Sequence, residues 1–94
     1  MPEARVTLRN ASGLHARPAK IFARAAAEHA AEVEVEKDDR RVNAKSVLSL
    51  LTLDCHKGDE ILIITGGEGA EATLADLVAL VEAGIGEGDE GSSP

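Results

Sequence analysis

The sequence predicts a single α+β domain, an open-faced sandwich in which a four-stranded antiparallel sheet carries three helices on one face (βαββαβα). Two observations support this prediction. The hydrophobic spacing alternates between that of strands and that of helices, in the order strand, helix, strand, strand, helix, strand, helix. A tight turn separates the second and third strands, and the other connections leave little room for long crossovers, which favours antiparallel pairing.

The strands are predicted from alternation and from one apolar run. Polar and apolar residues alternate at 5–9 and at 32–36, as in strands with one buried face. The pair Asp38-Asp39 supplies a turn, so 40–43 begins the hairpin partner of the second strand. The run 61–65 is apolar enough to lie in the centre of the sheet.

The helices are predicted from apolar residues at helical spacing. The first runs from residue 16 to about residue 31, with an apolar face formed by Ala19, Phe22, Ala23, Ala26 and Ala30. The segment 46–53 is apolar enough to suit a strand as well, but Ser46 favours a helix because serine is a good N-cap. The third helix spans 70–83, and Gly84 is a natural stop for it.

Length and composition describe one small acidic domain over 1–86, followed by a Gly-rich acidic tail, 87–94, that we expect to be disordered. The net charge of −7 argues against nucleic-acid binding. Cys55 is the single cysteine and cannot form an internal disulfide. We expect no signal peptide and no membrane span, because no apolar run is long enough. We therefore expect a cytoplasmic monomer.

The stretch 13–19, Gly-Leu-His-Ala-Arg-Pro-Ala, carries the chemistry. It places His15 where the first helix begins, and the unpaired N–H groups and dipole of a helix N-terminus favour an anion there. Pro18 suits a first turn, where its missing N–H is not needed. Neutral imidazole is a competent nucleophile near neutral pH, and the guanidinium of Arg17 has the donor geometry for phosphate.

The local chemistry leaves two interpretations open. His15 and Arg17 either form an anion site, which includes a phosphohistidine, or are an ordinary N-cap beside a solvated arginine. A local basic patch accompanies them, formed by Arg17, Lys20 and Arg24.

Two separate stretches resemble a known family. The run 13–19 resembles the active-site signature of HPr, the histidine phosphocarrier of the phosphoenolpyruvate-dependent sugar phosphotransferase system. The run 42–53, Val-Asn-Ala-Lys-Ser-Val-Leu-Ser-Leu-Leu-Thr-Leu, resembles the regulatory-serine signature of that family. Both lie at the usual places of the family, and the resemblance covers about residues 3 to 86.

The resemblance implies specific roles. His15 would take a phosphoryl group on Nδ1 from the phosphohistidine of enzyme I and pass it to the IIA component of a sugar transporter, with Arg17 coordinating the phosphate. Ser46 would be the target of the regulatory HPr kinase/phosphorylase in bacteria that have it. The docking surface would include Lys20, Val47, Leu48 and Leu51. The resemblance implies no metal and no organic cofactor.

The sequence departs from the family pattern at two positions near the signature. Residue 16 is alanine where serine or threonine is frequent, and Asp54 stands where glycine is common. The trio Asp54-Cys55-His56 lacks the spacing of a structural zinc site, so we expect no metal there. His29 is expected to interact with the C-terminus of the first helix. The glycine-rich run 66–69 lacks the lysine of a phosphate loop and is expected to be a turn.

Two other functions remain as alternatives. One is a purely regulatory binding module, in which phosphorylated Ser46 presents a surface to a transcription regulator; HPr-like proteins of that kind lack the active histidine, so His15 disfavours this role alone. The other is an unrelated small α+β interaction domain.

Overall fold

The computed structural model describes residues 1–85, so the expected acidic tail, 87–94, lies outside the described residues. The order of elements matches the prediction. The strands are β1 (Glu3–Thr7), β2 (Glu32–Lys37), β3 (Arg40–Asn43) and β4 (Glu60–Gly66). The helices are α1 (Ala16–Ala27), α2 (Val47–Leu51) and α3 (Ala70–Glu82).

The four strands form one antiparallel sheet in the order β1-β4-β2-β3. The predicted central position of the apolar fourth strand is therefore confirmed. Asp38 and Asp39 both have left-handed backbones, with φ of 52° and 69°. Two such residues between paired strands form the tight turn expected of a two-residue hairpin.

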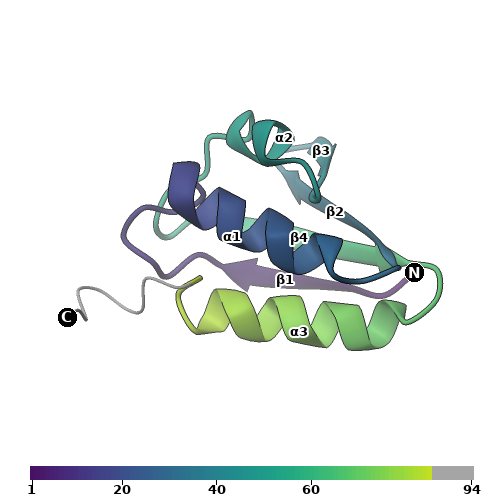
Figure 1. Cartoon of the computed structure of the whole chain (residues 1–94). Helices are drawn as coiled ribbons and strands as arrows, with labels where there is room; N and C mark the ends of the chain where they lie inside the picture. Colours follow the sequence, from purple (N-terminus) through teal and green to yellow (C-terminus); the bar gives the residue numbers. More distant parts are fainter. Residues whose placement is uncertain (86–94) are drawn as a thin grey trace.

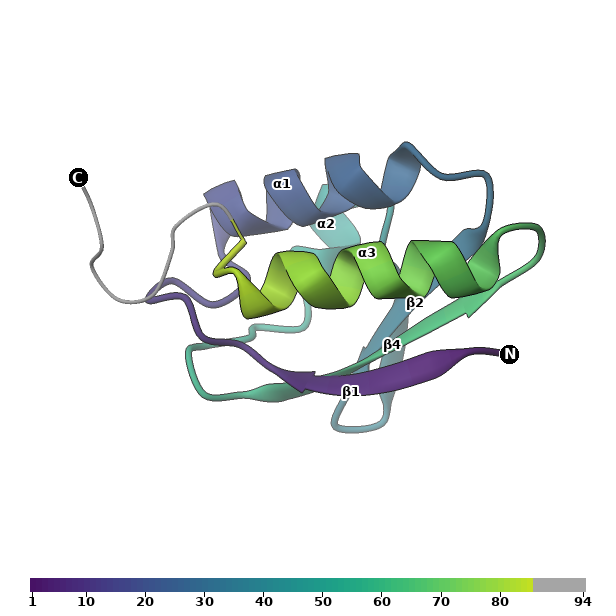
Figure 2. The same ribbon diagram turned by 90° about the horizontal axis from the view of Figure 1, so that it is seen from below.

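All three helices lie on one face of this sheet, which leaves its other face open (Figures 1 and 2). The core between the two layers is aliphatic apart from Phe22, which is fully buried. The largest buried side chains include Leu8, Leu14, Leu50, Ile61, Ile63 and Leu77. No helix within residues 1–85 is long and apolar enough to cross a membrane.

Element ends differ from the sequence prediction. Strand β1 covers 3–7 instead of 5–9, because its ladder with β4 runs from the pair Glu3–Ile64 to the pair Thr7–Glu60. Helix α1 ends at Ala27, with Glu28 as its C-cap, rather than near residue 31. Ala30 therefore lies beyond the helix and is exposed, although we expected it on the buried face.

Two further expectations are refined. The Nε2 atom of His29 lies 3.2 Å from Oδ2 of Asp76 on α3, so this side chain pairs with a neighbouring helix and not with the end of its own. Helix α2 is shorter than the predicted 46–53, but Ser46 is its N-cap as expected, since the Ser46 hydroxyl accepts a hydrogen bond of 3.2 Å from the Ser49 N–H.

Candidate functional site

His15 is the N-cap of α1 and is exposed. Its backbone is extended, with φ −83° and ψ −167°, and its carbonyl accepts a hydrogen bond of 2.8 Å from the Ala19 N–H. The imidazole makes no capping hydrogen bond to the helix. The first-turn N–H groups of Ala16 and Arg17 have no acceptor within the helix itself, and Pro18 has no N–H to leave unpaired. The position thus combines an exposed imidazole with the positive end of a helix dipole.

The loop before His15 is fixed by its own hydrogen bonds. The Asn10 side-chain amide donates to the Gly13 carbonyl at 2.7 Å, and the Gly13 N–H donates to the Asn10 carbonyl at 3.1 Å. The Leu14 N–H donates to the carbonyl of Cys55 at 3.1 Å, which ties this loop to a segment some forty residues away. The two segments touch so closely that a Cβ atom on Gly13 would lie 2.4 Å from the Cys55 oxygen.

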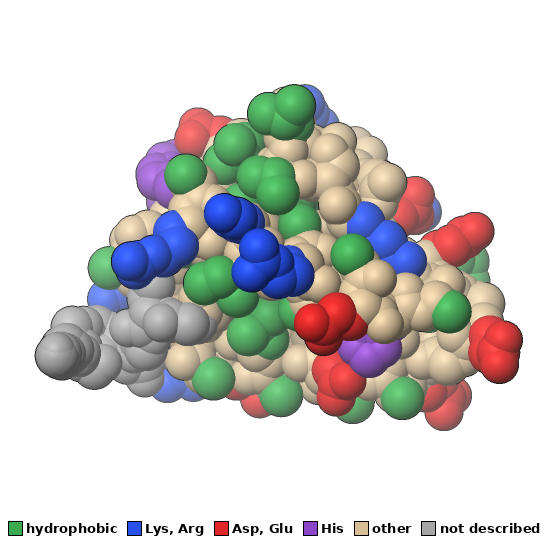
Figure 3. Space-filling view, in the orientation of Figure 1, with side chains coloured by type: hydrophobic (Ala, Val, Ile, Leu, Met, Phe, Trp, Pro, Cys, Tyr) green, Lys and Arg blue, Asp and Glu red, His purple; other side chains and the backbone are tan. Residues whose placement is uncertain are grey.

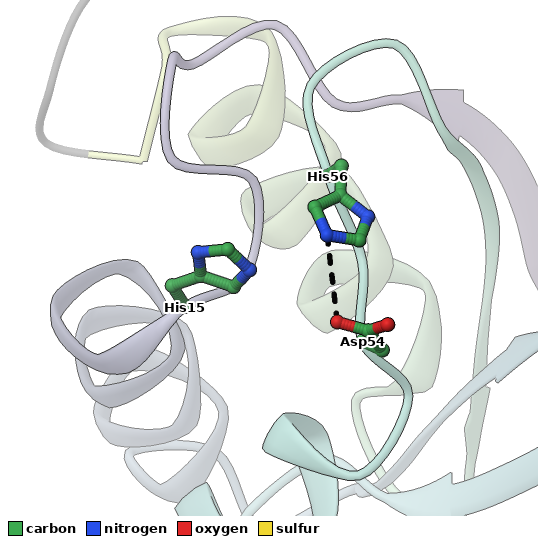
Figure 4. A group of neighbouring side chains, drawn as sticks. All are labelled: His15, Asp54 and His56. Carbon is green, nitrogen blue, oxygen red and sulfur yellow. Dashed lines mark ion pairs between the residues drawn. The ribbon is translucent and has the colours of Figure 1, made fainter.

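The segment on the other side of this contact brings His56 and Asp54 beside His15 (Figure 4). The two imidazole rings meet edge to face, with centroids 5.2 Å apart and an interplanar angle of 87°. Oδ1 of Asp54 lies 3.4 Å from Nε2 of His56. Sequence reasoning did not place His56 in the site. The sequence does carry a signal for it, since residues 54–56 alternate polar, apolar, polar. In the structure this alternation buries Cys55 and exposes its two neighbours.

The buried side chain of Cys55 packs in the core beneath segment 54–56, and its thiol is not exposed to react. It is fully buried, and burial raises the pKa of its thiol to about 11. Nearby, Oδ2 of Asp59 accepts a hydrogen bond of 2.8 Å from the His56 N–H and lies 3.1 Å from Nζ of Lys37. These two donors hold the pKa of the Asp59 carboxyl below its ordinary value.

Arg17 and Lys20 lie on the outer surface of α1. Their side chains are exposed and line a shallow hollow with Ile21, Arg24, Ala25 and Glu28. Figure 3 shows Lys and Arg side chains gathered over α1, next to hydrophobic side chains over α2. Arg17 follows His15 by two residues, in the first turn of α1. Asp54 and His56 approach His15 from a different segment of the chain, residues 54–56.

The predicted docking residues of α2 adjoin this basic surface. Helix α2 packs beside α1, and its Leu48 is 76% exposed. Val47 and Leu51 are half-buried and packed against the core. The Lys45 side chain, just before the N-cap Ser46, donates to the His29 carbonyl at 2.9 Å and so links the start of α2 to the end of α1.

Both the sequence and the fold are similar to those of known proteins. The family model described as "PTS HPr component phosphorylation site" matches residues 2–83. The phosphocarrier protein HPr of Streptomyces coelicolor is 47% identical over 88 residues, which cover 93% of this chain and 95% of that protein. The HPr-like protein Crh of Bacillus subtilis is 38% identical over 82 residues, covering 87% of this chain and 96% of that protein. The crystal structure of HPr-C-His from Thermoanaerobacter tengcongensis superposes with a TM-score of 0.89 at 36% identity, covering 93% of this chain and 98% of that one.

Proposed function

Since this chain belongs to the HPr family, the phosphocarriers of the phosphotransferase system, we propose that His15 is the residue that carries the phosphoryl group. The observation that supports this most is the exposed imidazole at the N-terminus of α1. A tetrahedral phosphoryl group on this ring would lie near the first-turn N–H groups and the positive end of the helix dipole. Proteins of this family are carriers and not catalysts, so the phosphohistidine is the product of one transfer and the reactant of the next.

Each transfer exchanges one P–N bond for another. The Nδ1 lone pair of neutral His15 attacks the phosphorus of the phosphohistidine on enzyme I, the P–N bond of the donor breaks, and the donor imidazole recovers its lone pair. In the second transfer His15 is the donor: a histidine of a IIA component attacks the phosphorus, the P–N bond to His15 breaks, and His15 recovers its lone pair. Transfers of this kind depend mainly on positioning and on neutralising the oxygens, and Arg17 in the first turn of α1 can supply that charge.

The test is to incubate the full chain with phosphoenolpyruvate and enzyme I and to record the intact mass. We expect one phosphoryl group, labile in acid, in the wild-type protein and in His29→Ala, and none in His15→Ala. His29 is the matched control because it is a histidine on the same side of the sheet that pairs with Asp76 instead. No phosphoryl gain with a competent enzyme I, or an acid-stable one, would contradict the proposal.

We also propose that Leu48 and its neighbours form the docking surface for enzyme I and IIA components. The support is an exposed leucine beside the basic hollow of α1, a combination suited to a partner with apolar and acidic side chains. Leu48→Ser should raise the KM for phosphorylation by enzyme I while leaving the unfolding midpoint unchanged, because a side chain that is 76% exposed adds little to the core. An unchanged KM would remove Leu48 from the docking surface.

Ser46 is proposed as the regulatory phosphorylation site. Its hydroxyl caps α2 two residues before Leu48, so a phosphoryl group there adds charge beside the proposed docking surface. Asparagine and aspartate are both good N-caps, so Ser46→Asn keeps the cap without charge and Ser46→Asp adds charge alone. We expect slower phosphorylation by enzyme I for Ser46→Asp than for Ser46→Asn. Equal rates would contradict the inhibitory role.

A further inference from the structure

Three metal-ligating side chains converge at the same place, and His15 is one of them. His15, Asp54 and His56 each offer one ligand atom, and these atoms all lie within 4.8 Å of one another. All three residues are exposed, and Figure 4 shows them facing a common space from two different segments. We propose that these three side chains bind a divalent transition-metal ion of the zinc type, and that the bound ion prevents His15 from accepting a phosphoryl group.

The donor set fits such an ion. Two imidazoles and one carboxylate are ligands that Zn²⁺ takes, and three protein ligands leave the fourth tetrahedral position to water. Bonds of about 2.0–2.2 Å place neighbouring ligand atoms of a tetrahedral site about 3.3 Å apart. Nε2 of His56 and Oδ1 of Asp54 are already 3.4 Å apart. The ligand atom of His15 lies within 4.8 Å of both, and the exposed ring is free of packing that would keep it from closing this distance around an ion.

The backbone holds both halves of the site in place. The hydrogen bond from the Leu14 N–H to the Cys55 carbonyl joins the residue before His15 to the residue between the other two ligands. Cys55 is fully buried, so its neighbours are fixed on the surface side of the segment. Oδ2 of Asp59 lies 3.7 Å from Nδ1 of His56. A carboxylate near the far nitrogen of a histidine favours the tautomer with its proton on that nitrogen, which leaves Nε2 for the metal.

Asp54 is the residue that makes the site complete, and its backbone allows a clean test. It has φ 54°, in the left-handed region, where glycine is the least strained residue. Asp54→Gly therefore removes the carboxylate without straining the chain. Alanine at the same position would add strain to the loss of the ligand and would confuse the two effects.

The second half of the proposal follows from the tautomers of imidazole and rests on the proposed role of His15 as phosphoryl acceptor. A neutral imidazole has one nitrogen with a free lone pair, and its other nitrogen carries the proton. When the ion takes that lone pair, the remaining nitrogen is an N–H and has no electron pair with which to attack phosphorus. Metal and phosphoryl group therefore compete for His15 whichever ring nitrogen the ion binds.

A histidine–carboxylate contact alone does not make a metal site, and the protein contains a matched example. His29 and Asp76 lie 3.2 Å apart, with the same pair of atom types. Within residues 1–85 this pair belongs to no group of three ligands. His29→Ala is therefore the control that removes a histidine and leaves the proposed site intact.

The binding test uses the full chain without an affinity tag, freed of metal by a chelator and then titrated with Zn²⁺ in a calorimeter. We expect one ion per chain, and a loss of affinity of at least about tenfold in His15→Ala, His56→Ala and Asp54→Gly but not in His29→Ala. In NMR spectra the ring signals of His15 and His56 should shift and those of His29 should not. Failure of wild-type protein to bind one ion, or equal affinity in Asp54→Gly, would overturn the site.

The competition test measures phosphorylation by enzyme I with and without Zn²⁺. Each protein is compared with its own zinc-free rate, because His56 lies beside His15 and its loss can change that rate. Zinc at saturation should suppress phosphorylation of the wild-type protein by a larger factor than that of His56→Ala, and the suppression that both share measures the effect of zinc on enzyme I. Equal phosphorylation of zinc-loaded and zinc-free wild-type protein would overturn the competition. If the zinc-free wild-type protein accepts no phosphoryl group, the proposed phosphocarrier role of His15 fails, and the calorimetric result still decides the metal site separately.

Discussion

Gly13→Ala is the substitution that best tests how the site is built. The new Cβ would lie 2.4 Å from the Cys55 oxygen and 2.6 Å from the Cα of His56, both backbone atoms that cannot rotate away. Gly13 also has φ 59°, a left-handed backbone that costs an L-residue roughly 1–2 kcal/mol. Forcing the two segments apart adds about 1–3 kcal/mol, the range of overpacking in a close contact. The expected loss is therefore about 2–5 kcal/mol of unfolding free energy.

Gly67→Ala is the matched control for this measurement. Gly67 has φ 87°, but an added Cβ there meets no atom within 4 Å. Both variants share the backbone strain and the gain from a stiffer unfolded chain, so their difference isolates the clash. Equilibrium unfolding in urea measures both. We expect Gly13→Ala to be the less stable by about 1–3 kcal/mol. If it is as stable as Gly67→Ala, the close contact between the two segments is not what fixes His15 beside His56.

Three further predictions concern stability. Ser46→Ala removes the hydroxyl that caps the Ser49 N–H and should cost about 1 kcal/mol in urea unfolding, whereas Ser46→Asn should cost less. Burial raises the pKa of the Cys55 thiol from 9.0 to about 11, so the thiol loses its proton at a lower pH in the unfolded chain than in the folded one. The free energy of unfolding should therefore fall by about 2–3 kcal/mol between about pH 9 and 11, and Cys55→Ala should lack that part of the fall. The pKa of Asp59 is lowered from 3.8 by the His56 N–H and by Lys37, so the ionised carboxylate stabilises the folded protein above that pH and this stabilisation is lost in acid. In thermal melts Asp59→Asn should be less stable than the wild-type protein at pH 7, and its stability should fall less than that of the wild-type protein as the pH drops below about 4.

The order of elements could be predicted because each element has a periodic pattern of its own. The alternation in β2 and the apolar run of β4 give strand positions without knowledge of their partners. Element ends depend on tertiary contacts instead. The first strand begins at Glu3 because Ile64 is there to pair with it, and no local pattern at residues 3 and 4 indicates that partner. Helix α1 stops four residues early for the same kind of reason, since the chain must turn to start β2 at Glu32.

The part of the candidate site around His15 could be predicted, and the part around His56 could not. His15 and Arg17 are close in sequence, so the chemistry of a helix N-terminus is visible in one short run. Asp54 and His56 reach His15 only through the contact between Leu14 and Cys55, which joins residues 41 positions apart. The sequence predicts no metal site at 54–56, because the trio lacks the spacing of a structural zinc site. The structure places His15, from another segment, beside Asp54 and His56.

Asp54 gives the site two opposed tendencies. Its carboxylate lies within 4.8 Å of the ligand atoms of both histidines, so it attracts a cation and repels the oxygens of a phosphoryl group on His15. If His15 carries the phosphoryl group as proposed, the second effect makes the phosphohistidine a readier donor, because the charge repulsion is relieved when the group leaves. Asp54→Gly should therefore weaken zinc binding and, at equilibrium with enzyme I, leave a larger fraction of the protein phosphorylated. Intact mass spectrometry of wild-type protein and variant at matched donor concentrations measures that fraction. An equal or smaller phosphorylated fraction in the variant would contradict this reasoning.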